Sequence, residues 1–440
     1  MTSTARDFPE ADMRRGLRTG AVMLASTLVL GTACSAPVPT TPAAPPPQPA
    51  YAATVQQRIT QAMKDNAIPG AVVLVRSPER GDWAGTFGTG TIGQNAPLSL
   101  DDYFRVGSNT KTMTVTVILQ LVQEGRLKLD DPIDRYQPGV PGGSKITIAQ
   151  LAEMRSGLYS YTFDRGFNEA LDQDPGHAWT PAELLRIAFA HPAQFAPGER
   201  FEYCNTNTVL LGLVIEHLTG KPLAQALRER IFTPLGLAHT SLPVNTDVAI
   251  PNPHPRGYAF GTNISTIDTS VLPEAEQKAA LAGTLLPHDE TDANPSWTWA
   301  AGGAISTAGD LATYVKALVA GGMLDATTQR LRLDSIRSTN PEQPQSAGYG
   351  LGIAQFGPLL GHDGQLPGYM TFMGYDPGAR LTIVIGTNLA AVPAGEGSAL
   401  VLLRAMLPVF YGAGIAPGGD PAAPASDPAA PEGGSAPPHN

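Results

Sequence analysis

The sequence predicts an α+β fold, in which an antiparallel sheet built from both ends of the folded region is flanked by helices and interrupted by an inserted helical domain. Segments with strand composition lie near the two ends of that region, and apolar residues at helical spacing fill the middle. The hydrophobic content of 42% is enough for a large core, so the 440 residues can form one large domain or two ordinary ones.

The first predicted elements are a helix and two strands. Apolar residues at every fourth position from Val55 predict a helix over 55–66. Apolar segments at 71–76 and 83–90 then predict two strands, joined by a turn that contains Pro78.

The middle and the end of the folded region differ in pattern. A strongly apolar segment at 110–123, ended by Gly125, predicts a long helix. Further helices are predicted at 147–154, 181–190, 207–218, 221–231 and 309–320. Strands are predicted again at 349–356, 368–375 and 380–387. Asp376-Pro377-Gly378 predicts the hairpin between the last two strands, and a final apolar helix is predicted at 397–410.

Both ends of the chain have compositions that cannot form a core. Residues 35–52 are rich in Pro and Ala, and we interpret them as an extended tether. Residues 412–440 are rich in Pro, Gly and Ala, and we interpret them as a disordered tail. The folded domain is therefore predicted at 53–411.

Residues 1–34 are interpreted as an export signal. A basic region at 13–18 precedes an apolar stretch at 21–30, which is too short to span a bilayer. Cys34 follows at the place of a lipoprotein acylation site, although Leu30 stands one position too early for that pattern. This signal is compatible with lipid attachment at Cys34, which would anchor the protein to a membrane. It is equally compatible with simple secretion. Either outcome predicts an exported protein, in the cell envelope or secreted.

The charge of the chain limits its partners. The net charge of −10 argues against nucleic acid as a partner, because the chain has no basic surface that could neutralise phosphates. Cys204 is the only other cysteine, and we interpret it as a buried free thiol.

Three short motifs, each occurring once in the chain, carry the candidate chemistry. They are Ser108-Asn109-Thr110-Lys111, Tyr203-Cys204-Asn205 and His362-Asp363-Gly364. A single S-x-x-K match would be weak, but three unique matches in this order favour an acyl-transfer enzyme with an active serine.

The first motif can supply a nucleophile and its base. Residues three apart on a helix share a face, so Lys111 can take the proton of Ser108 if its amine is neutral. Gly107 leaves room at the start of the helix, where backbone N–H groups favour an oxyanion. The alternative is a surface Ser and Lys on an ordinary helix, but the surrounding residues are too apolar for an exposed segment.

The second motif precedes the predicted helix 207–218. A tyrosine held near Ser108 can relay a proton to the leaving group, which is the role expected of Tyr203. Asn205 can donate to a substrate carbonyl and orient Lys111. Taken alone, Tyr203 is as well explained as a packed aromatic residue.

The third motif lies just before the predicted strand 368–375. Gly364 lets a substrate lie close to the strand edge, and the N–H of Gln365 can complete an oxyanion hole with that of Ser108. His362 is interpreted as a substrate-binding residue, with a buried structural histidine as the alternative.

These motifs resemble the S-x-x-K, Y-x-N and [KH]-x-G boxes of the serine β-lactamase and penicillin-binding-protein superfamily. The nearest branches are class C-like and include D-Ala-D-Ala carboxypeptidases and esterases, and the similarity spans about 60–405. The resemblance implies a β-lactamase/transpeptidase-like fold, an acyl-enzyme on Ser108, and proton transfer by Lys111 and Tyr203. It implies no metal and no other cofactor.

The third box departs from the family at Asp363, where a threonine is usual. In the histidine-containing branch, the hydroxyl at this place helps to hold the terminal carboxylate of the substrate. An ionised Asp363 would repel that carboxylate unless its side chain turned away or paired with an arginine. Because residues alternate across a strand, Asp363 and Gln365 are expected on one face. This departure favours ester substrates.

Two further groups of residues have an open interpretation. Four aromatic residues are candidates for cleft walls, with core packing as the alternative: Tyr159, Tyr161, Trp297 and Trp299. Four polar residues cluster in a predicted loop and are interpreted as solvated rather than as metal ligands: His288, Asp289, Glu290 and Asp292.

The leading hypothesis is an exported serine hydrolase of the D-Ala-D-Ala carboxypeptidase type, acting on cell-wall peptides or small amides. A carboxylesterase or β-lactamase of the same superfamily, with an ester or a β-lactam as substrate, is the first alternative. A non-catalytic penicillin-binding or envelope-binding protein is the second. The complete set of Ser108, Lys111 and Tyr203 argues against the last.

Overall fold

The computed structural model describes residues 48–339 and 347–413. The predicted export signal with Cys34, most of the predicted tether and nearly all of the predicted tail lie outside the described residues. Within the described ranges, no helix combines the length and the apolar character that crossing a membrane requires.

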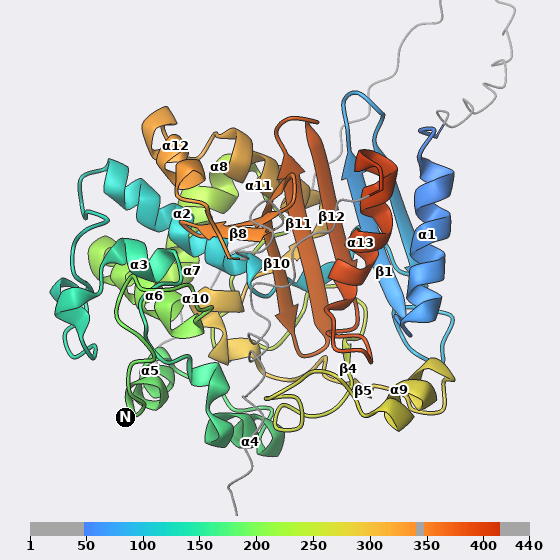
Figure 1. The fold of residues 1–440 in the computed structure, drawn as a ribbon, viewed down its shortest axis with the longest axis horizontal. Helices are drawn as coiled ribbons and strands as arrows, with labels where there is room; N and C mark the ends of the chain where they lie inside the picture. The colour runs from blue at the N-terminus through green and yellow to red at the C-terminus, as the bar shows by residue number, and fades with distance from the viewer. Residues whose placement is uncertain (1–47, 340–346, 414–440) are drawn as a thin grey trace, which may run out of the picture. The chain divides into compact units, whose positions relative to one another are not determined.

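An eight-stranded antiparallel sheet forms the core of the domain (Figure 1). Its strand order is β2-β1-β12-β11-β10-β9-β8-β7. The strands are β1 (Gly70–Arg76), β2 (Trp83–Gly88), β7 (Arg337–Ser338), β8 (Ala347–Gly350), β9 (Ile353–Phe356), β10 (Leu359–Leu366), β11 (Tyr369–Asp376) and β12 (Leu381–Thr387). Because β1 pairs with β12, from Ala71↔Thr387 to Arg76↔Thr382, the sheet joins both ends of the domain. The predicted fold class is confirmed.

Helices cover both faces of this sheet. α1 (Ala52–Asp65) and α13 (Ser398–Tyr411) lie side by side against one face, and α11 (Ala308–Ala320) packs on β1, β11 and β12 (Figure 1). The helical domain holds α2 (Asn109–Gln123), α3 (Ile148–Ala152), α5 (Pro181–Phe189), α6 (Asn205–Thr219), α7 (Leu223–Leu227), η4 (Arg228–Phe232), α8 (Thr233–Leu235), α10 (Trp299–Gly302) and α12 (Ala326–Asp334). α4 (Arg165–Gln173) and α9 (Glu274–Leu281) lie near the loops below the sheet in Figure 1.

Short elements complete the chain. β3 (Tyr103–Arg105) pairs with β6 (Ile305–Thr307), and β4 (Tyr258–Ala259) pairs with β5 (His288–Asp289). Four 3-10 turns connect longer elements: η1 (Ile133–Arg135), η2 (Gly143–Lys145), η3 (Tyr161–Phe163) and η5 (Pro295–Trp297).

The sheet separates two hydrophobic cores. Val55 and Ile59 of α1 are fully buried in the core that α1 and α13 form with one face of the sheet. The larger core lies on the helical-domain side, and α2 runs through it with every residue from Asn109 to Leu121 buried. Burial of each aliphatic side chain contributes about 1.5–3 kcal/mol, so the position of α2 is strongly determined.

The sequence prediction of the last strands is wrong in two places. The segment 349–356 is the hairpin β8–β9 rather than one strand. Its turn includes Gly352, which has φ +60° and lies so close to Val115 that a Cβ would be 2.4 Å from that side chain. β10 was not predicted, because its Gly, His and Asp residues lack strand composition, and the third motif therefore lies within a strand of its own.

Candidate active site

Ser108 and Lys111 meet at the start of α2, as their spacing predicted. Ser108 is the N-cap residue of the helix, and Lys111 is one turn further on with its side chain fully buried. Lys111 Nζ lies 2.9 Å from Ser108 Oγ and donates a hydrogen bond to the carbonyl of Ala301 over 2.7 Å. A proton can therefore pass directly from the hydroxyl to the amine.

The backbone around the helix start is held by contacts to two other elements. Gly107 has φ +52°, a conformation that favours glycine. The N–H of Val106 donates to the carbonyl of Ala304 over 3.0 Å. The amide of Asn109 donates to Thr371 Oγ1 over 2.7 Å, which ties α2 to β11. These contacts fix the backbone next to Ser108 to the segment before β6 and to β11.

Tyr203 lies against the lysine. It precedes Cys204, the N-cap residue of α6, and its side chain is buried. Lys111 Nζ lies 4.8 Å from the centroid of the Tyr203 ring, and Tyr203 and Ser108 line the same pocket. The structure therefore brings together the three residues that the sequence proposed for proton transfer.

Asn205 also lines this pocket, at the first position of α6. Its N–H donates to Ser160 Oγ over 3.1 Å, and its side-chain amide donates to Thr162 Oγ1 over 3.2 Å. Thr162 lines the pocket as well, and no sequence pattern had identified it. The proposed roles of Asn205 toward substrate and Lys111 stay predictions.

The third motif packs directly against the nucleophile. A Cβ on Gly364 would lie 2.0 Å from the carbonyl oxygen of Val106 and 2.7 Å from the nitrogen of Ser108. A Cβ on Gly107 would lie 2.8 Å from the nitrogen of Gln365. Two glycines thus bring the backbone N–H groups of Ser108 and Gln365 close together, as the proposed oxyanion hole requires.

His362 lies behind the pocket wall, contrary to its predicted role in binding substrate. Its side chain is fully buried and is not among the residues that line the pocket. Its Nδ1 donates to the carbonyl of Asp363 over 2.6 Å, and its Nε2 lies 3.1 Å from the hydroxyl of Tyr349. The ring centroids of His362 and Tyr203 are 6.2 Å apart. His362 therefore lies against Tyr349 and Tyr203 behind the pocket wall.

Tyr349 is a site residue that the sequence did not identify. It lies on β8, and its ring makes edge-on contacts with those of Tyr203 and His362. Burial raises the pKa of the Tyr349 phenol, and the negative charge of Asp363 raises it further. The phenol stays protonated. The weak strand signal around 349 gave no hint of this contact, which arises from the β8–β9–β10 pairing.

Asp363 lines the pocket together with Gly364 and Gln365. Its side chain is nearly buried, and Oδ1 lies 3.4 Å from Nδ1 of His362. β9 pairs with β10 only as far as Gly361. Residues 363–366 therefore form the part of the β10 edge that lines the pocket.

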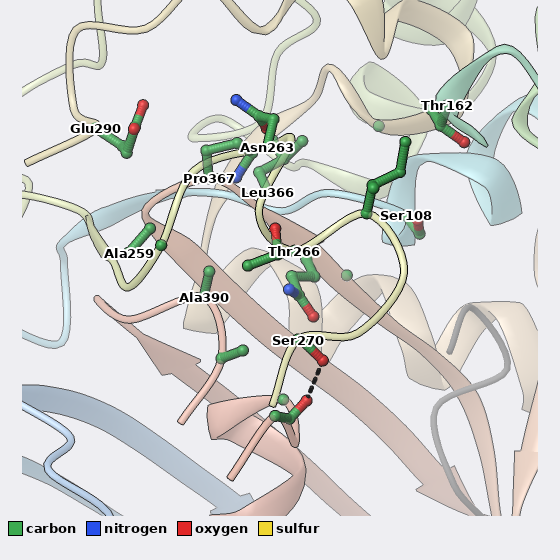
Figure 2. Close-up of a pocket in the computed structure, with 18 of the residues that line it drawn as sticks. Ser108, Thr162, Ala259, Asn263, Thr266, Ser270, Glu290, Leu366, Pro367 and Ala390 are labelled. Carbon is green, nitrogen blue, oxygen red and sulfur yellow. Dashed lines mark hydrogen bonds between the residues drawn. The ribbon is translucent and has the colours of Figure 1, made fainter. Parts of the chain in front are cut away.

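The pocket has a volume of about 500 Å³, and its far side is built from loops (Figure 2). We call residues 259–270 the strap. In Figure 2 the strap, with Asn263, Thr266 and Ser270, passes across the pocket between Ser108 and Glu290. Polar residues of the strap line the pocket beside residues of the segment 390–397. A cavity of this size suits a small-molecule ligand.

Side-chain hydrogen bonds hold the strap at its middle and at its C-terminal end. The Asp172 carboxylate of α4 accepts from the N–H of Asn263 (2.8 Å), the amide of Asn263 (2.8 Å) and the N–H of Ile264 (3.0 Å). These bonds lower the pKa of Asp172 against the opposing effect of its burial. At the C-terminal end of the strap, Ser270 Oγ donates to the carbonyl of Gly395 over 2.7 Å, the dashed line in Figure 2.

One of the four aromatic residues proposed for the cleft walls, Trp297, lines this pocket. Tyr161 and Trp299 are core residues instead, with exposed fractions of 0% and 8%. Tyr159 stacks on His191, with ring centroids 3.8 Å apart. Aromatic composition alone could not separate core from cleft.

The polar cluster at 288–292 lies at the surface, as predicted, with His288, Asp289 and Asp292 exposed and Glu290 partly buried. His288 Nε2 lies 2.7 Å from Glu290 Oε1, and both residues line the pocket. Asp289 pairs with Arg256. In the part of the chain that the structure describes, no group of three or more His, Cys, Asp or Glu side chains is arranged to hold a metal ion.

Cys204 is a free, buried thiol, as predicted. Its Sγ donates to the carbonyl of Leu158 over 3.3 Å. Burial raises the pKa of this thiol to about 11, so it is a packing residue rather than a second nucleophile.

Comparison with known proteins agrees with this geometry. The family model described as Beta-lactamase matches residues 55–405. Penicillin-binding protein 4 of Amycolatopsis lactamdurans is 25% identical over 364 residues, which cover 76% of this chain and 84% of that protein. A D-stereospecific amidohydrolase from Streptomyces sp. is 33% identical, covering 82% of this chain and 99% of its own, with a TM-score of 0.68. A D-amino acid amidase from Ochrobactrum anthropi SV3 is 26% identical, covering 81% and 98%, with a TM-score of 0.66.

Proposed function

The chain belongs to the beta-lactamase family of serine hydrolases, and from that premise we propose that it is an exported amidohydrolase that cleaves small D-configured amides through an acyl-enzyme on Ser108. The observation that carries the proposal is the 2.9 Å contact between Lys111 Nζ and Ser108 Oγ beside a pocket of about 500 Å³. Export rests on the signal predicted at 1–34.

The proposed reaction begins with attack of Ser108 Oγ on the amide carbonyl while Lys111 takes the hydroxyl proton. The N–H groups of Ser108 and Gln365 stabilise the oxyanion that forms. Tyr203, in contact with Lys111, passes a proton to the leaving nitrogen as the C–N bond breaks. Water then attacks the acyl-enzyme, loses its proton to the same groups, and releases the acid and Ser108.

The substrate class follows from the relatives and from the pocket. The Streptomyces and Ochrobactrum structures are named for D-stereospecific amide hydrolysis and match this chain over about four-fifths of its length. The pocket is large enough for a short peptide or an amino acid amide, and its walls mix polar and apolar groups. These observations favour an amide of a D-amino acid over a simple ester.

A D-Ala-D-Ala carboxypeptidase acting on cell-wall peptides is the second candidate. It is supported by the similarity to penicillin-binding protein 4 and by the predicted export. Asp363 on the pocket wall counts against it, because a carboxypeptidase substrate ends in a carboxylate. A carboxylesterase or β-lactamase would use the same acyl-enzyme, and a non-catalytic binding protein would not need the Ser108–Lys111 contact.

Covalent labelling tests the acyl-enzyme. The mature protein is incubated with a fluorophosphonate probe and with a fluorescent penicillin, and intact mass is measured for the parent and for Ser108→Ala. We expect the parent to gain the mass of one acyl or phosphonyl group, and the variant to gain none. A protein that takes up neither reagent at Ser108 is not a serine hydrolase.

Turnover then separates the substrate classes. D-phenylalanine amide, L-phenylalanine amide, a D-Ala-D-Ala peptide, a chromogenic cephalosporin and a p-nitrophenyl ester are compared by kcat/KM. We expect the D-amide to exceed its L-enantiomer and the D-Ala-D-Ala peptide. A preference for the peptide would establish the carboxypeptidase instead, and turnover of the ester alone would establish the esterase.

A further inference from the structure

The charge next to the nucleophile has a fixed position. Gly364 lies directly against Val106 and Ser108, so close that a Cβ on it would be 2.0 Å from the Val106 carbonyl oxygen, and this contact places the segment 363–365 beside Ser108. Any substrate carbonyl held by the N–H groups of Ser108 and Gln365 therefore lies beside Asp363, two residues earlier in β10.

With an ionised Asp363, the His362–Asp363 pair carries no net positive charge. Nδ1 of His362 faces a carbonyl oxygen at 2.6 Å, and a carbonyl only accepts, so Nδ1 carries a proton. Nε2 faces the hydroxyl of Tyr349 and can be bare or protonated. With an ionised Asp363, the pair has a charge of −1 in the first case and zero in the second. Neither state supplies the cation that an incoming carboxylate needs.

The other positive side chains that line the described pocket already have carboxylate partners. Arg404 pairs with Glu396, and His288 pairs with Glu290. Three carboxylates line the pocket, those of Glu290, Asp363 and Glu396, against one guanidinium. Lys111 is needed as the base and is bonded to Ser108 and Ala301. The electrostatic balance of the wall is therefore negative or neutral.

From these contacts we infer that the site selects against a carboxylate on the leaving group and accepts substrates whose leaving group is uncharged or cationic. This inference rests on the proposed function and narrows its substrate class. The expected substrates are amides and peptides whose leaving group ends in a carboxamide, an amine or an ester rather than in a carboxylate. Asp363 is the residue that determines this selectivity, and its effect is repulsion.

Two matched ester substrates test the inference. Acetyl-D-alanyl glycolate and acetyl-D-alanyl glycolamide have the same acyl group and the same scissile ester bond, and only the first leaving group carries a carboxylate. Both are activated enough to report on any working acyl-enzyme. We expect kcat/KM for the glycolamide to exceed that for the glycolate at least about tenfold at low salt, and the ratio to fall as salt screens the charge.

Substitutions of single carboxylates test whether Asp363 causes the difference between the two esters. Asp363→Asn and Asp363→Thr should lower the glycolamide-to-glycolate ratio toward one, whereas Asp292→Asn should leave the ratio as in the parent. Asp292 is an exposed carboxylate close to this region but outside the pocket lining, so it is a matched control for the loss of one charge.

The possible results distinguish failure of the charge selectivity from failure of the proposed hydrolase function. Equal rates for the two esters in the parent, or faster glycolate turnover, overturn the inference and leave the serine hydrolase intact. No Ser108-dependent turnover of either ester overturns both. The ratio of the two ester rates is measured in the parent protein. The selectivity can therefore be tested even if an Asp363 variant does not fold.

Discussion

The two sides of the pocket are built in different ways. On the reactive side, Ser108, Lys111 and Tyr203 lie at the starts of α2 and α6, and β10 packs against them through backbone atoms. On the opposite side, the strap is irregular apart from β4 and is held by side-chain hydrogen bonds to Asp172 and to the carbonyl of Gly395. The reactive side is joined by close backbone contacts, whereas the strap is held by a few side-chain hydrogen bonds.

This difference leads us to expect that the reactive side determines the rate of turnover and that the strap determines which substrates bind. Displacing a backbone that touches another backbone requires a shift of whole elements, which close packing resists. A side-chain hydrogen bond contributes only about 0.5–1.5 kcal/mol net, or about 1.5–3 kcal/mol when one partner is charged. Changes on the reactive side should therefore abolish turnover, and changes in the strap should alter which substrates bind.

The largest effect is expected from Gly364→Ala. The new methyl group would lie 2.0 Å from the carbonyl oxygen of Val106, so β10 must move away from α2 and the N–H of Gln365 must leave the oxyanion hole. We expect kcat/KM to fall at least about 10³-fold, the scale of losing an oxyanion donor and of misplacing the reacting groups. Ester turnover and the melting temperature are measured together.

Gly309→Ala is the matched control for that substitution. Gly309 lies in the first turn of α11, and the nearest atom to its added Cβ is Thr307 Oγ1 at 4.0 Å. Activity and stability should match those of the parent. If Gly364→Ala kept more than a tenth of the parent kcat/KM, the close contact between β10 and α2 would not position the oxyanion hole.

A smaller loss is expected from Tyr203→Phe. The ring and its contact with Lys111 remain, and only the hydroxyl that passes the proton is removed. General acid–base groups contribute about 10²–10⁴-fold, so kcat should fall about 100-fold while KM changes little. Pre-steady-state labelling by a fluorophosphonate, which needs no protonated leaving amine, should slow less than amide turnover. Equal slowing of both would assign Tyr203 to positioning instead.

The sequence predicted the contact between Ser108 and Lys111 because it depends on local spacing. Ser108 and Lys111 needed only one helical turn to meet, and α2 was recognisable as a continuous apolar segment. The third motif was recognised as a set of residues, but its strand was not predicted because β10 is rich in Gly and polar residues. His362 was therefore placed in the pocket, whereas the register of β10 turns it inward.

The strap could not be predicted, because none of its contacts is local. Asp172 lies on α4 and accepts from residues 91 and 92 positions later in the chain, and Ser270 donates to a carbonyl 125 positions later. Hydrogen bonds of this kind follow from the tertiary fold and have no periodic signature. The contact between Tyr349 and His362 was missed for a related reason, since it depends on the pairing of β8, β9 and β10.

Asp172→Ala is expected to loosen the strap without damaging the chemistry. Loss of three hydrogen bonds to one carboxylate should raise KM about fivefold, equivalent to about 1 kcal/mol, with kcat within about twofold of the parent. Glu169→Ala, an exposed carboxylate on the same helix, should change neither constant. A fall in kcat with unchanged KM would show that the strap contributes to the reactive side instead.

The smallest effect concerns the His288–Glu290 pair beside the strap. The hydrogen bond that His288 donates to the Glu290 carboxylate raises the pKa of His288. Partial burial opposes this rise, and the negative charges of Glu290, Asp172 and Asp289 add to it. Because the folded-state pKa lies above the unfolded value of about 6.5, the pair stabilises the protein fully below that pH. The stabilisation is lost as the pH rises through the folded-state pKa.

Comparison of the parent with Glu290→Gln measures this contribution. His288 is nearly half exposed, so the pair should contribute only a few tenths of a kcal/mol. The parent should melt slightly higher than the variant at pH 5.5, and the two melting curves should converge above pH 8. A gap that widened with pH would mean that Glu290 acts through its own charge rather than through the imidazolium, and this corner of the pocket would then be an anionic wall at neutral pH. The ratio of glycolamide to glycolate turnover would change in Glu290→Gln only if the leaving group reached Glu290. An unchanged ratio in this variant would show that the charge selectivity comes from the β10 side of the pocket, where Asp363 lies.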